Sequence, residues 1–186
     1  MTTPPERFET ERLQLRPPVT EDAAAIFATY ARDPEVTRYV TWRPHTRTAD
    51  TLEFLRYCAE GWAKNGPFNW VITLRESGHL VGAIELRPQG HRVELGYVLG
   101  RGYWGRGLMT EAACAVTRWA LAQPDVYRVW AVCDVANRAS ARVLEKAGMQ
   151  REGLLRGWSL HPNAGDTPRD CWCYARVKEA GVARCP

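Results

Sequence analysis

Short runs in which apolar and polar residues alternate recur along this chain, and such alternation predicts half-buried β-strands. In the first run, Leu13 and Leu15 alternate with polar neighbours. The central runs follow one another with only short turns between them, which predicts an antiparallel meander. The predicted strands are residues 12–16, 69–74, 80–86, 92–99, 128–133, 150–160 and 169–177.

Other stretches space their apolar residues as an amphipathic helix does, with capping or breaking residues at their ends. Thr20 is expected to cap the first helix, Asn137 caps the last, and Gly148 closes it. The predicted helices are residues 21–31, 48–64, 108–123 and the segment from the Asn137 cap to residue 147. This order predicts an α+β fold, in which a mixed, mostly antiparallel twisted sheet has helices on both faces.

Length and composition narrow the class of protein. The 186 residues fit one domain with a sizeable core, so we expect a single domain over 1–186. The formal charge is +4, and the scattered, mostly arginine basic residues argue against a nucleic-acid partner. We find no stretch that resembles a signal peptide or a membrane span, so we expect a cytoplasmic protein without a membrane partner.

We expect the cysteines to be reduced, because disulfides are rare in the cytoplasm. Cys171 and Cys173 lie two residues apart, but no second cysteine or histidine pair stands at ligand spacing, so we expect no metal site. The remaining cysteines are expected to be ordinary core or surface residues: Cys58, Cys114, Cys133 and Cys185.

A glycine-rich turn follows the predicted strand 92–99 and leads into the predicted helix that starts at Leu108. Its glycines are Gly100, Gly102, Gly105 and Gly107. Glycine lets the backbone approach a ligand closely, and the unpaired N–H groups at a helix start point toward an anion. The order of strand, glycine turn and helix therefore predicts a binding site for a phosphorylated ligand.

Part of this turn also fits a second motif. From Gly100 to Gly105 it matches G-x-G-x-x-G, and Asp125 lies about 20 residues further on, as in the dinucleotide fingerprint. However, the loop continues beyond the third glycine, aromatic residues occupy its tight turn, and little chain remains for a doubly wound parallel sheet. These features disfavour a nicotinamide dinucleotide site. A purely structural turn, in which the glycines only supply positive φ, is the other alternative.

The segment Trp104-Gly-Arg-Gly-Leu-Met109 resembles motif A of the GNAT superfamily of N-acetyltransferases, (Gln/Arg)-x-x-Gly-x-(Gly/Ala). Trp104 and Met109 depart from that pattern as they do in the branch that acetylates the alanine or serine N-termini of ribosomal proteins. Residues 10–16, 80–85 and 94–99 resemble strands of this branch, and residues 137–148 resemble its motif B helix. The resemblance covers residues 8–177 approximately and implies the GNAT fold.

This resemblance implies direct transfer of an acetyl group from acetyl-CoA to an amine, with a protein N-terminal α-amine as one candidate acceptor. A small-molecule amine or an antibiotic is the alternative acceptor. In the family, motif A amides hold the pyrophosphate of coenzyme A, and the preceding strand pairs with its pantetheine arm. The positions that carry these contacts over are Tyr97, Val98, Leu99, Gly105, Arg106, Gly107, Leu108, Met109 and Thr110, and the asparagine that matches Asn137 also contacts the cofactor in the family. Arg142 is a further candidate for the cofactor's phosphates, with a solvated surface charge as the alternative.

The same resemblance suggests catalytic groups. Glu94 and Glu85 are candidate general bases, because each is expected on a strand that borders the acceptor cleft. A reaction without a dedicated base is the alternative, since an α-amine has a pKa near 8. Leu144 stands where many members have a tyrosine acid, and Ser140 is the substitute expected to hydrogen-bond the leaving sulfur. That replacement also leaves open a catalytically silent module that binds acetyl-CoA.

The acceptor side gives weaker signals. Trp42 and Trp158 are candidates for lining the acceptor pocket, because each lies in a segment expected to border it. An exposed edge strand in the last predicted hairpin could support a homodimer.

Overall fold

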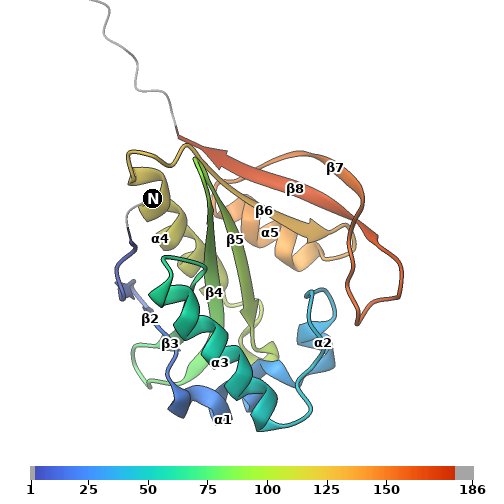
Figure 1. Cartoon of the computed structure of the whole chain (residues 1–186). Coiled ribbons are helices and arrows are strands. Elements are labelled where there is room, and N and C mark those ends of the chain that lie inside the picture. The colour runs from blue at the N-terminus through green and yellow to red at the C-terminus, as the bar shows by residue number, and fades with distance from the viewer. Residues whose placement is uncertain (1–2, 179–186) are drawn as a thin grey trace, which may run out of the picture.

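The computed structural model describes residues 3–178, which form an open sheet flanked by helices (Figure 1). Within this part of the chain the sheet has eight strands in the order β1-β2-β3-β4-β5-β6-β8-β7, which confirms the predicted mixed sheet. The strands are β1 (Phe8–Glu9), β2 (Leu13–Arg16), β3 (Phe68–Leu74), β4 (Leu80–Gln89), β5 (Arg92–Leu99), β6 (Arg128–Asp134), β7 (Gln150–Ser159) and β8 (Arg169–Val177).

The junction between β5 and β6 differs from the rest of the described sheet. These two strands run parallel, whereas the other described pairings are antiparallel. A parallel pair needs a long crossover connection, and the turn after β5 together with α4 supplies it. Pairing joins residues 92–94 of β5 to residues 128–130 of β6, and beyond these the strands spread apart (Figure 1).

Helices cover both faces of the sheet, as the sequence predicts. On one face α4 packs through Val116 into the cluster that contains Leu95 of β5. On the other face α3 packs through Leu55 into the cluster that contains Ala83 of β4. The helices are α1 (Ala23–Ile26), α2 (Pro34–Thr37), α3 (Thr48–Ala63), α4 (Leu108–Ala122) and α5 (Arg138–Lys146).

Two predicted features of the last helix are confirmed. Asn137 is the N-cap of α5, and its Oδ1 accepts the Ser140 N–H at 3.1 Å. Gly148 follows the helix with φ of 82°, the left-handed conformation that commonly ends helices. These local signals fix where α5 begins and ends, and therefore where its first turn lies.

The predicted Thr20 cap is wrong. Thr20 makes no side-chain cap, and the carboxylate of Asp22 instead accepts the Val19 N–H at 2.8 Å. Arg16 holds the same carboxylate at 2.7 Å. The predicted helix is divided into a 3₁₀ turn, α1 and a π-helical turn at Phe27–Ala31, and the short helix α2 after it was not predicted. A tertiary ion pair, which local sequence does not reveal, decides this helix start.

Among residues 3–178, no helix is long and apolar enough to cross a membrane, and no group of three or more metal-ligating side chains is found. The five cysteines in this part of the chain are free, while Cys185 lies outside the described residues. Strand β7 lies at an edge of the sheet. The homodimer through this edge stays a prediction.

Candidate active site

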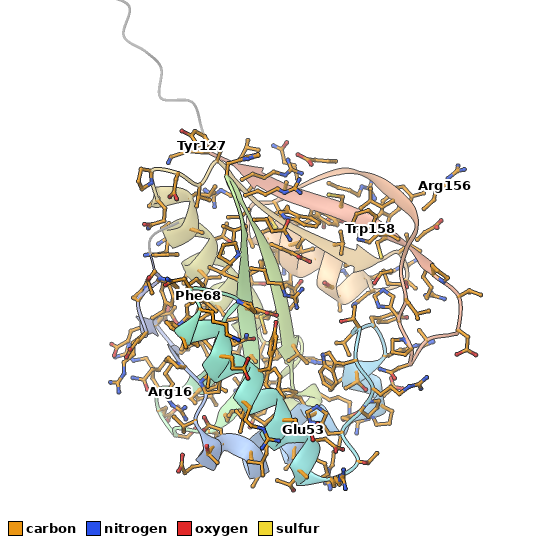
Figure 2. All side chains as sticks on the ribbon, in the orientation of Figure 1. Arg16, Glu53, Phe68, Tyr127, Arg156 and Trp158 are labelled. Carbon is orange, nitrogen blue, oxygen red and sulfur yellow. The ribbon has the colours of Figure 1, made fainter. Side chains whose placement is uncertain are left out.

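A cleft of about 1280 Å³ opens where β5 and β6 separate. Pockets for one small ligand usually measure about 300–1,000 Å³, so this cleft has room for two reactants. Residues of α2, α3 and strands β3 to β5 line one side, and residues of α4, β6 and α5 line the other. Figure 2 shows the side chains of these elements. The cleft therefore connects the two faces of the sheet.

One side of the cleft is built on the glycine turn and the start of α4. Gly105 and Gly107 have φ of 74° and 75°, a left-handed conformation that is strained for any residue with a Cβ. Gly107 is the N-cap of α4 and provides no side-chain cap. The Glu111 N–H bonds to the Gly107 carbonyl, so the amides of residues 108–110, which line the cleft, precede the helical bonding pattern and can bind an anion.

Arg12, just before β2, anchors this turn from outside the cleft. Its guanidinium donates to the Arg106 carbonyl at 2.9 Å and pairs with the Glu111 carboxylate at 2.6 Å. From within the turn, Trp104 Nε1 donates to the Leu99 carbonyl at 2.7 Å. These contacts join the turn to β2 and to the end of β5, so the amides at the start of α4 are held in place.

Two hydroxyl groups meet beside the first turn of α5. Tyr97 Oη lies 2.8 Å from Ser140 Oγ and 3.1 Å from the Ser140 carbonyl oxygen. Burial raises the pKa of the Tyr97 phenol, although its hydrogen bond with Ser140 acts in the opposite direction. The phenol therefore stays protonated and serves as a hydrogen-bond donor. Leu144, at the position where the family often has tyrosine, is fully buried in the core.

The opposite side of the cleft holds two carboxylates on adjacent strands, with Arg87 between them. Arg87 Nη2 lies 2.7 Å from Glu85 Oε2, and its Nη1 lies 3.6 Å from Glu94 Oε1. Glu85 also accepts the Tyr57 hydroxyl at 3.2 Å, and Glu94 accepts from Gln89 Nε2 at 3.2 Å. Burial, followed by the charge of Glu85, raises the pKa of Tyr57, which keeps this hydroxyl a donor. Arg87 thus orients both candidate bases.

Sequence reasoning missed Arg87, although a signal for it exists. The short turn between β4 and β5 sets a register in which Arg87 faces Glu94 across the hairpin. Residues that face each other in an antiparallel pair interact directly, and opposite charges there are favourable. Extending the predicted strand 80–86 by one residue would have placed this ion pair in the site.

Two loops bound the side of the cleft where the sequence predicts the acceptor. Asn163, in the loop between β7 and β8, donates through Nδ2 to the carbonyls of Thr37 and Trp42, both at 2.7 Å. Trp42 lines the cleft, and its ring lies 5.2 Å from that of His45. His161, from the same loop as Asn163, is 4% exposed and also lines the cleft. The β7–β8 loop therefore rests against the segment that follows α2.

Two predicted site residues do not line the cleft. Trp158 lies on β7, is 52% exposed and is not among the residues that line the cleft (Figure 2). Arg106 lies in the glycine turn, but its guanidinium lies over the Tyr103 ring at 5.8 Å. The predicted residues that line the cleft are Trp42, Glu85, Glu94, Tyr97, Val98, Leu99, Gly105, Gly107, Leu108, Met109, Thr110, Asn137, Ser140 and Arg142.

The charges on the α4–α5 side fit an anionic cofactor. Arg138, Arg142 and Lys146 line this wall, and its described lining residues include no carboxylate. Within 4 Å, a Cβ built on Gly105 would meet nothing from beyond the neighbouring residues, so the turn leaves open space beside its amides. Unpaired amides, basic side chains and open space together suit the phosphates of coenzyme A.

Comparisons with known proteins agree with this geometry. The acetyltransferase (GNAT) domain family matches residues 12–150. The uncharacterized N-acetyltransferase YoaA of Bacillus subtilis is 32% identical over 174 residues, 92% of this chain and 96% of its own length. A solved acetyltransferase structure from T. thermophilus superposes with a TM-score of 0.82 at 30% identity, covering 96% of this chain and 93% of the other.

A further relative has an assigned substrate. The ribosomal protein uS5 alanine N-acetyltransferase of Escherichia coli is 31% identical over 75 residues, which is 40% of this chain and 39% of that protein. The family match spans most of the chain, and the sheet, the parting of β5 from β6 and the glycine turn at the start of α4 agree with it. The chain belongs to the GNAT family and is an acetyl-CoA-dependent N-acetyltransferase.

Proposed function

We propose that this enzyme binds acetyl-CoA on the α4–α5 side of the cleft and transfers its acetyl group directly to an amine that enters from the α3 side. The observation that carries this proposal is the cleft itself. The cleft opens where β5 leaves β6. One of its walls has helix-start amides and basic side chains, and the other wall has two carboxylates. Both reactants can therefore meet at the free end of β5.

The chain's own groups suit the cofactor. The amides from Gly105 to Thr110 and the start of α4 would hold the pyrophosphate, with Arg142 close to the phosphates. Beyond residue 94, the described pairing of β5 with β6 ends, so the backbone of Tyr97, Val98 and Leu99 borders the cleft. That edge would pair with the pantetheine arm, which places the thioester beside Ser140.

Glu94 is the better candidate for the general base. Glu85 accepts three hydrogen bonds, from the Tyr57 hydroxyl, Arg87 Nε and Arg87 Nη2. Glu94 has one hydrogen bond, from Gln89, and a longer ionic contact to Arg87. Its oxygens retain more capacity to take a proton from the incoming ammonium, directly or through a water. The neutral amine can then attack, while Glu85 holds Arg87 in position.

Ser140 would assist the leaving sulfur. Its hydroxyl can donate to the departing thiolate when its own oxygen accepts a hydrogen bond from Tyr97, which lies 2.8 Å away. A phenol with a raised pKa donates a hydrogen bond without giving up its proton. We therefore assign Tyr97 the role of orienting Ser140.

The neighbouring thiol of Cys133 does not suit a covalent route. Cys133 lines the cleft but is 5% exposed, and burial raises its pKa to about 12. The thiolate is the nucleophilic form, so a thiol with this pKa is unreactive near neutral pH. This supports direct attack by the acceptor amine over an acetylated cysteine.

The identity of the acceptor amine is the most specific part of this proposal. The uS5 alanine N-acetyltransferase of E. coli supports an α-amine at a protein N-terminus, but its likeness covers less than half of the chain. The loop between β7 and β8, which rests on the segment after α2, favours a smaller amine because it bounds the acceptor side. We also place the reaction in the cytoplasm.

Two-substrate kinetics test the proposal. The purified enzyme is given acetyl-CoA and a panel of primary amines, and free thiol is measured as it forms. Direct transfer predicts rates whose double-reciprocal lines intersect, whereas a covalent acetyl-enzyme predicts parallel lines. A thermal melt with acetyl-CoA runs alongside. A melting shift without thiol release for any amine would identify a silent binding module and overturn the proposed function.

A further inference from the structure

Arg12 contacts the glycine turn without lining the cleft. It lies just before β2, and β2 packs beside α4 (Figure 1). Its Nη1 donates to the Arg106 carbonyl at 2.9 Å, and neither Arg12 nor Arg106 is among the residues that line the cleft. The next residue, Gly107, does line it. The peptide unit that joins Arg106 to Gly107 therefore lies between Arg12 and the cleft.

The orientation of this peptide unit decides what Gly107 offers to a ligand. The unit is trans, and in a planar trans peptide the C=O and the N–H point in opposite directions. Because Arg12 holds the Arg106 oxygen, the Gly107 N–H points away from Arg12. This N–H makes no hydrogen bond within the described chain. It is therefore an available donor that precedes the amides of residues 108–110.

The local sequence leaves this orientation open. Turning a peptide unit over changes ψ of the residue before it and φ of the residue after it, and glycine accepts either sign of φ. Gly107 has φ of 75°, and the reversed unit would give it a φ that costs glycine little more. The reversed unit would also place the Arg106 oxygen where the N–H now points, and an oxygen there repels an anion. A contact from outside the turn must select the orientation.

Glu111 fixes the guanidinium that makes this contact. Arg12 Nε and Nη2 lie 2.7 and 2.6 Å from Glu111 Oε2, and the backbone N–H of Arg12 donates to Oε1 at 2.9 Å. Thr10 Oγ1 also donates to Oε1, at 2.6 Å. Burial opposes the ionisation of Glu111, but these hydrogen bonds outweigh it and lower the pKa of the carboxyl. Glu111 is thus a charged partner that holds Arg12 near neutral pH.

The shape of the guanidinium matters more here than its charge. Glu111 offsets the charge of Arg12, so the pair adds little net positive charge beside the turn. The planar fork of arginine can span two acceptors at once, and here it joins the Glu111 carboxylate to the Arg106 carbonyl. A lysine keeps the charge but presents one compact ammonium, which does not reproduce this fork. Arginine and lysine at this position therefore separate orientation from charge.

We propose that Arg12 is a positioning residue for acetyl-CoA, which holds the Arg106 carbonyl so that the Gly107 N–H is directed at the pyrophosphate of the cofactor. This inference rests on the proposed function, in which the turn binds that group. It adds a residue outside the cleft to those that determine cofactor affinity. The effect is confined to the phosphate part of the cofactor and spares the thioester and the amine.

Calorimetric binding of coenzyme A tests this inference without turnover. Arg12→Lys should raise the Kd for coenzyme A by about tenfold or more, the effect of one hydrogen bond to a charged group. The Arg12 side chain is 46% exposed, so the substitution leaves the core intact. A thermal melt of the free variant establishes that it is folded.

Arg75→Gln is the matched control. Arg75 Nη1 donates to the Thr10 carbonyl at 2.9 Å, which is also a bond from a guanidinium to the backbone just before β2. Arg75 does not line the cleft, and its side chain does not contact the glycine turn. Its substitution should leave the Kd for coenzyme A unchanged.

A truncated donor assigns the effect to the phosphates. S-Acetylpantetheine carries the thioester arm of acetyl-CoA without the pyrophosphate. Thiol release gives kcat/KM with each donor. We expect Arg12→Lys to lose about tenfold or more with acetyl-CoA and nothing with S-acetylpantetheine, while kcat at saturating acetyl-CoA stays unchanged. A general loosening of the structure would instead lower both values.

The outcomes separate this inference from the proposed function. An unchanged Kd in Arg12→Lys, an equal rise in Arg12→Lys and Arg75→Gln, or equal losses with the two donors would overturn the inference while acetyl transfer stands. A raised Kd in Arg12→Lys alone, without thiol release by the wild type for any amine, would support the positioning role and overturn the proposed function. A wild type that does not bind coenzyme A would overturn both.

Discussion

The hydroxyl of Tyr97, on the last part of β5, lies 2.8 Å from Ser140 Oγ, in the first turn of α5. Many members of this family carry a tyrosine at the position of Leu144, which is buried in the core here. A phenol therefore does reach the cofactor side of the cleft, but it comes from a strand and contacts the serine. We propose that the pair Tyr97 and Ser140 takes the place of a single helical tyrosine.

This pair predicts a specific kinetic phenotype. Tyr97→Phe removes one hydrogen bond to Ser140 and should lower kcat by about fivefold, with KM for acetyl-CoA unchanged. Ser140→Ala should lose more, and the double variant should be no slower than Ser140→Ala, because Tyr97 acts through the serine. Initial rates of thiol release measure all three. Fully additive losses would contradict the assigned role of Tyr97.

The conformation of the glycine turn leads to a second prediction. Gly107→Ala places a Cβ at φ of 75°, which costs about 1–2 kcal/mol, and 3.6 Å from Arg12 Nη2. We expect the free energy of unfolding to fall by that amount and KM for acetyl-CoA to rise, because the amides at the start of α4 shift.

Gly78→Ala is the matched control for this experiment. Gly78 has φ of 70°, lies away from the cleft, and an added Cβ there would meet nothing within 4 Å. It should show the same loss of stability by urea denaturation without a change in KM. Equal changes in KM for the two variants would show that backbone strain, and not the cofactor turn, causes the effect.

The Asp134 carboxylate, buried at the end of β6, gives a pH prediction. Burial opposes its ionisation, but hydrogen bonds from Arg169 and the Ala136 N–H outweigh this and lower the pKa. Because the folded pKa lies below the unfolded value of about 4, the stabilisation is present above that pH and is lost as pH falls through the folded pKa.

Asp134→Asn should therefore lower the free energy of unfolding by about 3 kcal/mol near neutral pH, since it leaves Arg169 without its counterion. The difference between wild type and variant should shrink as the pH falls below about 4. Urea denaturation across this range measures both curves. A difference that stays constant down to acidic pH would show that the charge of Asp134 does not stabilise the fold.

How far the sequence predicted this site depends on the range of the interactions involved. Gly107 and Asn137 depend on residues close to them in the chain. The glycine before α4 and the cap of α5, three residues before Ser140, could therefore be predicted from the sequence. The roles of Arg87 and of the Tyr97 hydroxyl depend on strand register and on where β5 leaves β6. Those features are set by packing between segments far apart in the chain.

The misplaced predictions have similar causes. Trp158 was expected at the acceptor pocket, but β7 shifts register against β8 between Leu155 and Ser159, and an irregular strand does not keep a predictable face. Thr20 was expected to cap the first helix, but Asp22 accepts the Val19 N–H instead. Arg16 of β2 holds the Asp22 carboxylate in place. In both cases a neighbouring strand decides the outcome.

We propose that the Glu94 carboxylate activates an amine for direct attack on acetyl-CoA held across the cleft. The most direct test is kcat/KM for thiol release by Glu94→Gln, measured beside Glu60→Gln and with a thermal melt in acetyl-CoA. Glu60 is the control because it pairs with Lys64 and does not line the cleft. We predict a loss of about a hundredfold or more in Glu94→Gln, typical of a missing general base, with the melting shift retained. Wild-type activity in Glu94→Gln would contradict this account.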